Sequence, residues 1–162
     1  MYLIQSLPAL RPPLTPVVQV ALTVHVAMTA YQSVVYDWVK ATGTLRLSPF
    51  DPRIGKSHRH NFAPLNNKCM ELRKVCNHPA LSYPPDYGAD QAELLRQCGK
   101  LCVLDRLLIK LHRTGHRVLL FSTMTRLLDL LEGYLRWRRF GAEGAEAMQY
   151  ARIDGGTALE DR

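Results

Sequence analysis

The second half of the chain has the clearest spacing of apolar and polar positions. Between residues 100 and 113, leucines recur every three or four positions, which predicts an amphipathic helix that is terminated by Gly115. Residues 118–121 then form a continuous apolar run, as expected of a strand buried on both faces. This part of the chain therefore alternates between helical and extended patterns.

A second helix is predicted after this strand, capped by Thr123 or Thr125. Its core side is expected to consist of Leu127, Leu128, Leu131, Tyr134 and Leu135. A second short strand is predicted at 150–154, and Thr157 with Glu160 forms a capping box at the start of a further helix. This order of helices and strands predicts an α/β fold with a parallel sheet.

The first half is predicted to be mainly helical with one strand. Residues 1–16 are rich in proline and indicate a poorly ordered leader. Apolar and polar or small residues alternate from Val18 to Val26, which predicts a strand with one apolar face. Thr29 is placed to cap a helix at 30–40. That helix is expected to bury Tyr31, Val34, Val35 and Trp38.

Prolines and glycines between residues 43 and 64 predict a loop. A helical stripe follows it and is ended by Pro79. The members of this stripe are Leu65, Cys69, Leu72 and Cys76. Asp90 then caps a short helix that runs through Leu95.

The composition indicates one soluble domain with a basic surface. The 162 residues are 47% hydrophobic and 22% charged, with a net charge of +7. Residues 99–140 contain nine lysines and arginines but only three acidic residues. This excess of positive charge favours a nucleic acid or another polyanion as partner. A solvated helical face is the alternative explanation. No secretory signal or long apolar run is evident, so neither export nor a membrane is expected.

Two strand-to-helix turns carry the candidate phosphate contacts. These are Ser122, Thr123 and Thr125 in the first turn, and Arg152, Gly155, Gly156 and Thr157 in the second. Backbone N–H groups point outward at such turns, and the helix dipole favours an anion there. The alternative is that the threonines are ordinary helix caps, each contributing about 1 kcal/mol.

Four cysteines and one histidine raise the question of a zinc site. They are Cys69, Cys76, His78, Cys98 and Cys102. None of the cysteines forms the closely spaced pair that zinc sites prefer. Buried, reduced cysteines and a turn histidine between Asn77 and Pro79 are the favoured interpretation, so no metal is expected.

Two long blocks resemble the Swi/Snf family of chromatin-remodelling ATPases, most closely the Brahma type. LNNKCMELRKVCNHP, residues 65–79, resembles a helix-and-turn signature of that family. CGKLCVLDRLLIKLHRTGHRVLLFSTMTRLLDLLEGYLRWRR, residues 98–139, resembles the opening of its helicase C-terminal lobe. VAMTAYQSVVYDWVKATGTLRL, residues 26–47, is also similar. The likeness covers most of the chain in the family's order.

The resemblance implies two parts of a motor with RecA-like lobes. Residues 17–97 would be the trailing edge of the first lobe with its helical protrusion, and 98–162 an incomplete helicase C-terminal lobe. The family's fourth motif matches 120–125, and its next DNA-facing motif matches 152–157. Ala151 replaces a residue that is usually basic in the family, and 140–149 resembles an insertion. Residues 1–16 have no recognised counterpart.

The same resemblance implies ATP and magnesium as cofactors of a complete family protein, but this chain lacks the motifs that bind them. Neither Gly55-Lys56 nor Gly99-Lys100 belongs to a GxxxxGK[ST] cradle, and no Asp-Glu pair is present. The arginine finger would lie beyond residue 162. The sequence therefore predicts a fragment of a DNA translocase that is not catalytic alone.

The partners implied by the resemblance are duplex DNA, nucleosomes and other Swi/Snf subunits, in the nucleus. Two alternatives remain open: a non-enzymatic interaction protein, and a basic DNA-binding module without motor ancestry.

Overall fold

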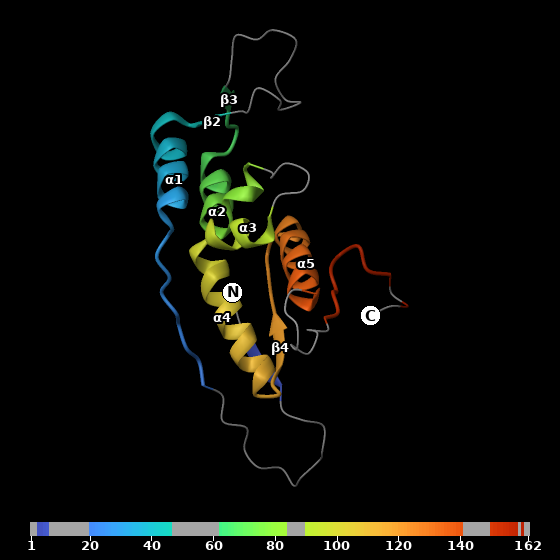
Figure 1. The fold of residues 1–162 in the computed structure, drawn as a ribbon. Helices are drawn as coiled ribbons and strands as arrows, with labels where there is room; N and C mark the ends of the chain where they lie inside the picture. The colour runs from blue at the N-terminus through green and yellow to red at the C-terminus, as the bar shows by residue number, and fades with distance from the viewer. Residues whose placement is uncertain are drawn as a thin grey trace.

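The structure is a computed structural model that describes residues 3–6, 20–46, 62–83, 90–140, 150–158 and 160. Its helices are α1 (Ala30–Thr42), α2 (Lys68–Asn77), the short 3-10 helix η1 (Pro79–Leu81), α3 (Gln91–Arg96), α4 (Gly99–Arg113) and α5 (Thr125–Phe140). Its strands are β1 (Leu3–Ser6), β2 (Thr44–Arg46), β3 (Phe62–Pro64) and β4 (Arg117–Leu120). Figure 1 shows α1 beside α2 at one end, and α4, β4 and α5 together at the other.

Helix α1 begins where the sequence predicts and ends two residues later than predicted, at Thr42. The Thr29 hydroxyl accepts a hydrogen bond from the Gln32 amide at 3.1 Å, and the Gln32 side chain accepts one from the Thr29 amide at 3.2 Å. Gly43 ends the helix with φ of 65°, in the left-handed region that glycine adopts without strain. The predicted cap is confirmed.

The buried face of α1 differs from the prediction. Val35 is buried as expected, but Tyr31, Val34 and Trp38 are 44%, 69% and 38% exposed. Gln32 and Val39 are buried instead, because α1 packs against α2 and the start of α4 through the face that carries Gln32. Apolar spacing located the helix but selected the wrong side of it.

The segment after α1 also departs from the predicted loop. β2 and β3 pair antiparallel, with Thr44 opposite Pro64, and Leu45 is buried. Leu45 packs with Val39 in a small cluster that also receives Leu65, Leu72 and Tyr83. In α2, which follows, Glu71 and Val75 are the buried residues, whereas Cys69 of the predicted stripe is exposed.

The larger core lies between α4, β4 and α5. Its buried members are Cys98, Leu101, Leu104, Leu108, Leu131 and Tyr134. Val118 and Leu120 of β4 pack against it, whereas Leu119 and Phe121 are about half exposed. The predicted helix–strand–helix order is confirmed here, but the prediction that the strand is buried on both faces is wrong. Gly115 adopts φ of 72° after α4, as predicted.

A buried polar contact ties α4 to α5. Asp105 accepts a hydrogen bond from the Tyr134 hydroxyl at 2.6 Å and two from the Arg138 guanidinium, each at 2.6 Å. Burial and the neighbouring Asp105 raise the pKa of the Tyr134 hydroxyl, which therefore stays a donor. The Asp105 carboxylate is buried, and a paired charge in such a place is far less costly than an unpaired one.

The expected parallel sheet is not seen among the described residues. β4 pairs antiparallel with β1, with Leu3 opposite Leu120 and Ser6 opposite Arg117. Residues 150–154 form no strand; Arg152 joins them to α5 by ion pairs with Asp129 and Glu132. Residues 20–26 of the other predicted strand are not paired and expose Val20, Leu22 and Val24. A strand without pairing partners is not stable by itself, so the alternation of apolar and polar residues alone did not produce a strand here.

Candidate functional site

Ser122 and Thr123 of the first predicted phosphate turn, but not Thr125, line a hollow of about 200 Å³ between α2, α4, the turn after β4, and α5. Its polar lining consists of Asn77, His78, Lys100, Ser122 and Thr123, and its apolar lining of Leu101, Leu104, Phe121, Leu127, Leu130 and Leu131. The polar groups thus come from the end of α2, the start of α4 and the turn after β4. Two blocks that are far apart in sequence, 65–79 and 98–139, meet at this hollow.

The turn from β4 into α5 is built by Ser122. The Ser122 hydroxyl accepts a hydrogen bond from the Met124 amide and donates one to the Met124 carbonyl, both at 3.1 Å. Helix α5 begins at Thr125, and the Met124 carbonyl accepts from the amides of Leu127 and Leu128. Met124 therefore occupies the cap position, and the prediction that Thr123 or Thr125 caps α5 is wrong.

This displacement of the cap changes what the threonines can do. Thr123 precedes the cap, Thr125 is the first helical residue, and both are exposed. The amide N–H groups in the first turn of a helix have no partner within the helix. The start of α5 therefore presents exposed hydroxyls together with a positive helix end, a combination that suits an anion.

Lys100 brings the fixed positive charge to this hollow. It is the second residue of α4, and its Nζ atom donates to the Asn77 side-chain oxygen at 3.1 Å. The neighbouring Gly99 amide donates to the Gln32 side chain at 2.9 Å, which fixes the start of α4 against α1. Lys100 and Asn77 were not predicted as site residues. In the sequence, Gly99-Lys100 resembles only part of an ATP cradle, and nothing near it points to Asn77.

His78 is a structural turn residue. Its Nδ1 atom accepts from the Ala80 amide at 3.0 Å, so its Nε2 atom carries the proton and donates to the Leu94 carbonyl at 3.0 Å. The side chain is 1% exposed, and burial lowers the pKa of the imidazole, which favours the neutral ring. The prediction of a turn histidine in Asn77-His78-Pro79 is confirmed.

The second predicted turn is closed by its own side chains. The Asp154 carboxylate accepts from the Gly156 amide at 2.8 Å, and the Thr157 hydroxyl accepts from the Asp154 amide at 2.9 Å. Gly155 is exposed, and a Cβ there would meet no atom within 4 Å. The helix that Thr157 and Glu160 were expected to start would extend into residues outside those described.

Arg152 is bound within the chain. Its guanidinium contacts Asp129 at 2.8 Å, Glu132 at 3.0 Å and Asp154 at 2.6 Å. The hydrogen bond to Asp129 and then that to Asp154 are the main causes that raise the pKa of Arg152. No described residue of 150–158 lines the hollow. The structure thus brings Ser122, Thr123 and Lys100 together but leaves Arg152, Gly155, Gly156 and Thr157 apart from them.

The thiols are used in packing and hydrogen bonding. The buried Cys98 thiol donates to the Asn77 carbonyl at 3.1 Å, and the Cys102 thiol donates to the Leu95 carbonyl at 3.0 Å. Burial raises the pKa of Cys98, which favours the neutral thiol. Within the described part of the chain, no three His, Cys, Asp or Glu side chains are grouped to hold a metal. A search of the same residues for a helix long and apolar enough to cross a membrane finds none.

Comparison with known proteins identifies the relatives of this chain. ATP-dependent helicase BRM of Arabidopsis thaliana is 54% identical over 149 residues, which are 89% of this chain and 6% of that protein. The ISWI chromatin-remodeling complex ATPase ISW2 of Saccharomyces cerevisiae is 38% identical over 148 residues, 89% of this chain and 12% of that protein. ATP-dependent helicase brm of Drosophila melanogaster is 37% identical over 145 residues, 83% of this chain and 8% of that protein.

These matches span only a small part of each relative, between 6% and 12% of its length. No family model matches the chain. The relatives are nevertheless consistent with one another, because both helicases of the Brahma type and a related remodelling ATPase align over more than four fifths of the chain. The chain belongs to the Swi/Snf family of ATP-dependent helicases and is of the Brahma type.

Proposed function

We propose that this chain is a segment of an ATP-dependent DNA translocase that acts on nucleosomes, and that its role there is to hold the DNA backbone. The observation that carries the proposal is the convergence of Lys100, Ser122 and Thr123 on one hollow at the start of α5. These three residues converge in a chain of which 89% aligns with a segment of ATP-dependent helicase BRM.

The chemistry of the hollow supports a phosphate contact. A phosphate oxygen beside it would accept from the Thr125 and Arg126 amides at the start of α5, from the Thr123 hydroxyl and from the Lys100 ammonium. None of these groups distinguishes one base from another. The contact would therefore position DNA without reading its sequence, as a translocase requires.

We also propose that α4, β4 and α5 begin a RecA-like lobe of the helicase C-terminal type. Their order supports this, as does the polar turn that follows β4. The division into residues 17–97 and 98–162 follows from the same proposal. Arg152, Gly155, Gly156 and Thr157 would contribute a second contact only after Arg152 leaves its carboxylate partners.

ATP hydrolysis is not assigned to this chain. The residues around Gly55-Lys56 and Gly99-Lys100 do not fit an ATP phosphate, and in the structure the Gly99 amide and Lys100 are bonded to Gln32 and Asn77. ATP and magnesium would therefore be bound by other parts of a longer motor. Duplex DNA, nucleosomes and other Swi/Snf subunits are the proposed partners, in the nucleus.

The experiment is a titration of the 162-residue chain with fluorescent duplex DNA at several salt concentrations. Lys100→Ala and Thr123→Ala are compared with Lys68→Ala, which removes an exposed lysine of α2 outside the hollow. Loss of one phosphate contact should lower the slope of log affinity against log salt by about 0.9 for Lys100→Ala. Thr123→Ala should weaken binding with little change in that slope.

An unchanged slope and affinity for both hollow variants would show that the phosphate contact is placed wrongly. Equal losses for Lys100→Ala and Lys68→Ala would favour the alternative of a basic module that binds through general charge. No duplex binding at any salt concentration would favour a protein-interaction role.

A further inference from the structure

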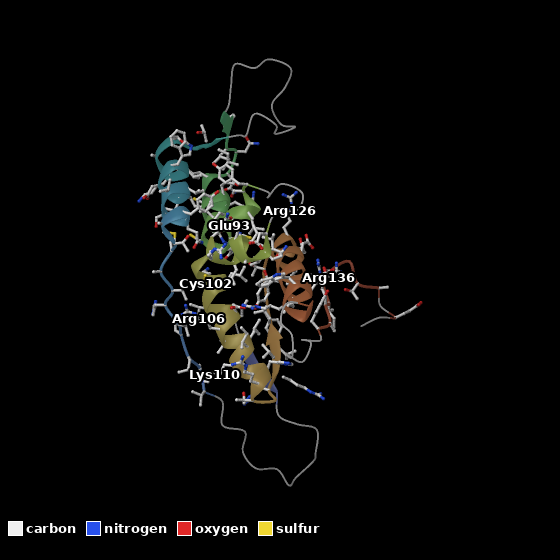
Figure 2. The ribbon with its side chains drawn as sticks, in the orientation of Figure 1. Glu93, Cys102, Arg106, Lys110, Arg126 and Arg136 are labelled. Atoms are coloured by element: carbon white, nitrogen blue, oxygen red, sulfur yellow. The ribbon has the colours of Figure 1, made fainter. Side chains whose placement is uncertain are left out.

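The exposed face of α4 carries a row of cations that the proposed DNA contact does not use. Arg106, Lys110 and Arg113 lie four and three residues apart, so they share one side of the helix. Figure 2 shows Arg106 and Lys110 following one another along α4, away from its start. All three side chains are exposed. We call these three residues the α4 basic row.

These cations have no counterion within the described part of the chain. Asp105 is the one acidic residue between Gly99 and Arg117, and its carboxylate faces the other way, toward Tyr134 and Arg138. Elsewhere the exposed arginines 96 and 136 do have acidic partners. The α4 basic row is therefore a local excess of positive charge.

Helix stability alone does not explain the row. Cations in the last turn of a helix are favoured by its dipole, which accounts for Lys110 and Arg113. Arg106 lies about two turns before the end of α4, where the dipole has little effect. A contact with an external anion accounts for all three positions together.

The surface between the cations is hollowed and partly apolar. Arg106, Ile109, Lys110, Arg113 and Thr114 line an open hollow of about 430 Å³. Its walls include the half-buried Ile109 and the aliphatic stems of the long cationic side chains. Leu101 and Leu104 border the proposed DNA hollow near the start of α4, so this second hollow lies toward the other end of the helix.

We propose that the α4 basic row binds an acidic protein segment, with an apolar side chain in the hollow and carboxylates on the arginines. Guanidinium groups bind carboxylates through paired hydrogen bonds, and apolar anchors ringed by polar contacts are typical of protein interfaces. A phosphate backbone would satisfy the cations but would offer no side chain for the hollow beside Ile109. The surface therefore fits an acidic peptide or helix better than DNA.

The test uses two fluorescent probes with the 162-residue chain. One is a synthetic helical peptide with glutamates spaced four and three residues apart around a leucine, and the other is a duplex DNA. Arg106→Gln, Lys110→Gln and Arg113→Gln are combined in one variant. The matched control combines Lys40→Gln, Lys68→Gln and Arg73→Gln, which removes the same charge from exposed positions of α1 and α2.

The α4 variant should weaken peptide binding about tenfold, whereas the control should change it less than about twofold. The two variants should lower DNA binding to the same extent, because both remove three charges. Ile109→Ser should weaken the peptide alone. Because the substituted cations are exposed, the temperature of thermal unfolding should fall only slightly, through the lost interaction of Lys110 and Arg113 with the helix dipole. Arg106→Lys with Arg113→Lys should retain part of the peptide affinity.

Three results would overturn the inference. Equal losses of peptide binding in the α4 and control variants would show that the peptide responds only to the net charge of the chain and not to the α4 basic row. A much larger loss of DNA binding in the α4 variant than in the control would assign the row to nucleic acid. A peptide affinity that does not respond to the α4 variant would leave the row without a role in binding.

Discussion

Two regions of this chain are held in opposite ways. The helical junction, formed by Gln32, Val75, His78 and Gly99, joins α1, α2, α3 and α4 through hydrogen bonds that are buried or partly buried. The segment 150–158 lies against α5 through ion pairs in which Arg152 is 27% exposed and Asp129 is 61% exposed. Buried polar contacts are costly to break, whereas exposed ion pairs contribute little and are screened by salt.

The difference bears on function because the proposed DNA hollow depends on the first region. Lys100 and Asn77 stand beside Gly99 and His78, so the positions of these hollow residues follow from the junction. The 150–158 segment, by contrast, can be released without unfolding the core. Buried and partly buried hydrogen bonds thus support the proposed DNA contact at the turn after β4. Exposed ion pairs hold Arg152 in the second turn, so a DNA contact there would first require Arg152 to leave its carboxylate partners.

The largest effect is expected from Gly99→Ala. A Cβ at this position would collide with the Ala27 carbonyl oxygen, which is backbone and cannot move aside easily. The free energy of unfolding should fall by about 3 kcal/mol or more, measured by urea titration. Gly133→Ala in α5 is the control, because the nearest side-chain atom there is 3.6 Å away. It should instead gain about 0.5–1 kcal/mol. Equal effects of the two substitutions would contradict the packing at the junction.

Gln32→Ala should follow closely. Gln32 donates to the Val75 carbonyl at 3.0 Å and accepts from the Gly99 amide at 2.9 Å, and its side chain is 1% exposed. Removing the side chain leaves three backbone groups without this partner, the Val75 carbonyl and the amides of Gly99 and Thr29, and should cost about 3 kcal/mol. Gln91→Ala, at the start of α3, should cost less than about 1 kcal/mol in the same titration. A small loss for Gln32→Ala would mean that water replaces its bonds.

His78 should make stability depend on pH. Burial lowers its folded pKa below the unfolded value, so the unfolded chain binds the proton more readily. The contribution of neutral His78 to the free energy of unfolding should be fully present above about pH 6.5. It should be lost progressively as the pH falls below that value toward the pKa of His78 in the folded chain.

The measurement is the free energy of unfolding at about pH 7.5 and about pH 5.5 for the parent chain and for His78→Asn. The asparagine retains an acceptor for the Ala80 amide but does not titrate. The parent should lose more stability at the lower pH than the variant does. Parallel losses would assign the pH dependence to other groups.

The smallest effect on stability is expected from Arg152→Gln. The ion pairs of Arg152 lie at the surface, so thermal unfolding should hardly change. Hydrogen exchange at 150–158 should nevertheless become faster, and high salt should produce the same change in the parent chain. Slow exchange in the variant would show that the segment is held by other contacts.

Local rules predicted the helices and several of their ends. Thr29 starts α1 and Gly115 follows the end of α4 through bonds within a few residues, which sequence makes visible. The wrong predictions depended on distant partners. The buried side of α1 is set by its contact with α2 and α4, and residues 150–154 meet α5 through Arg152, a contact that the local pattern of 150–154 does not reveal.

The site was predictable only in part for the same reason. Ser122 and Thr123 were identified from the strand-to-helix pattern, but the contribution of Lys100 and Asn77 required α2 and α4 to meet in space. The sequence predicted a threonine cap for α5, whereas in the structure the Ser122 hydroxyl bonds the Met124 amide and neither Thr123 nor Thr125 caps the helix. The available signals were two separate ones, Asn77-His78-Pro79 and the Gly99-Lys100 helix start, which lie apart in the sequence and meet only in space.

Hydrogen–deuterium exchange of the 162-residue chain, with and without duplex DNA, measures the proposed contact at the start of α5. Exchange should slow at the amides of residues 122–128 when DNA is bound, with little change at 106–113. Unchanged exchange at 122–128 in a chain that is saturated with DNA would contradict the proposed contact at the start of α5.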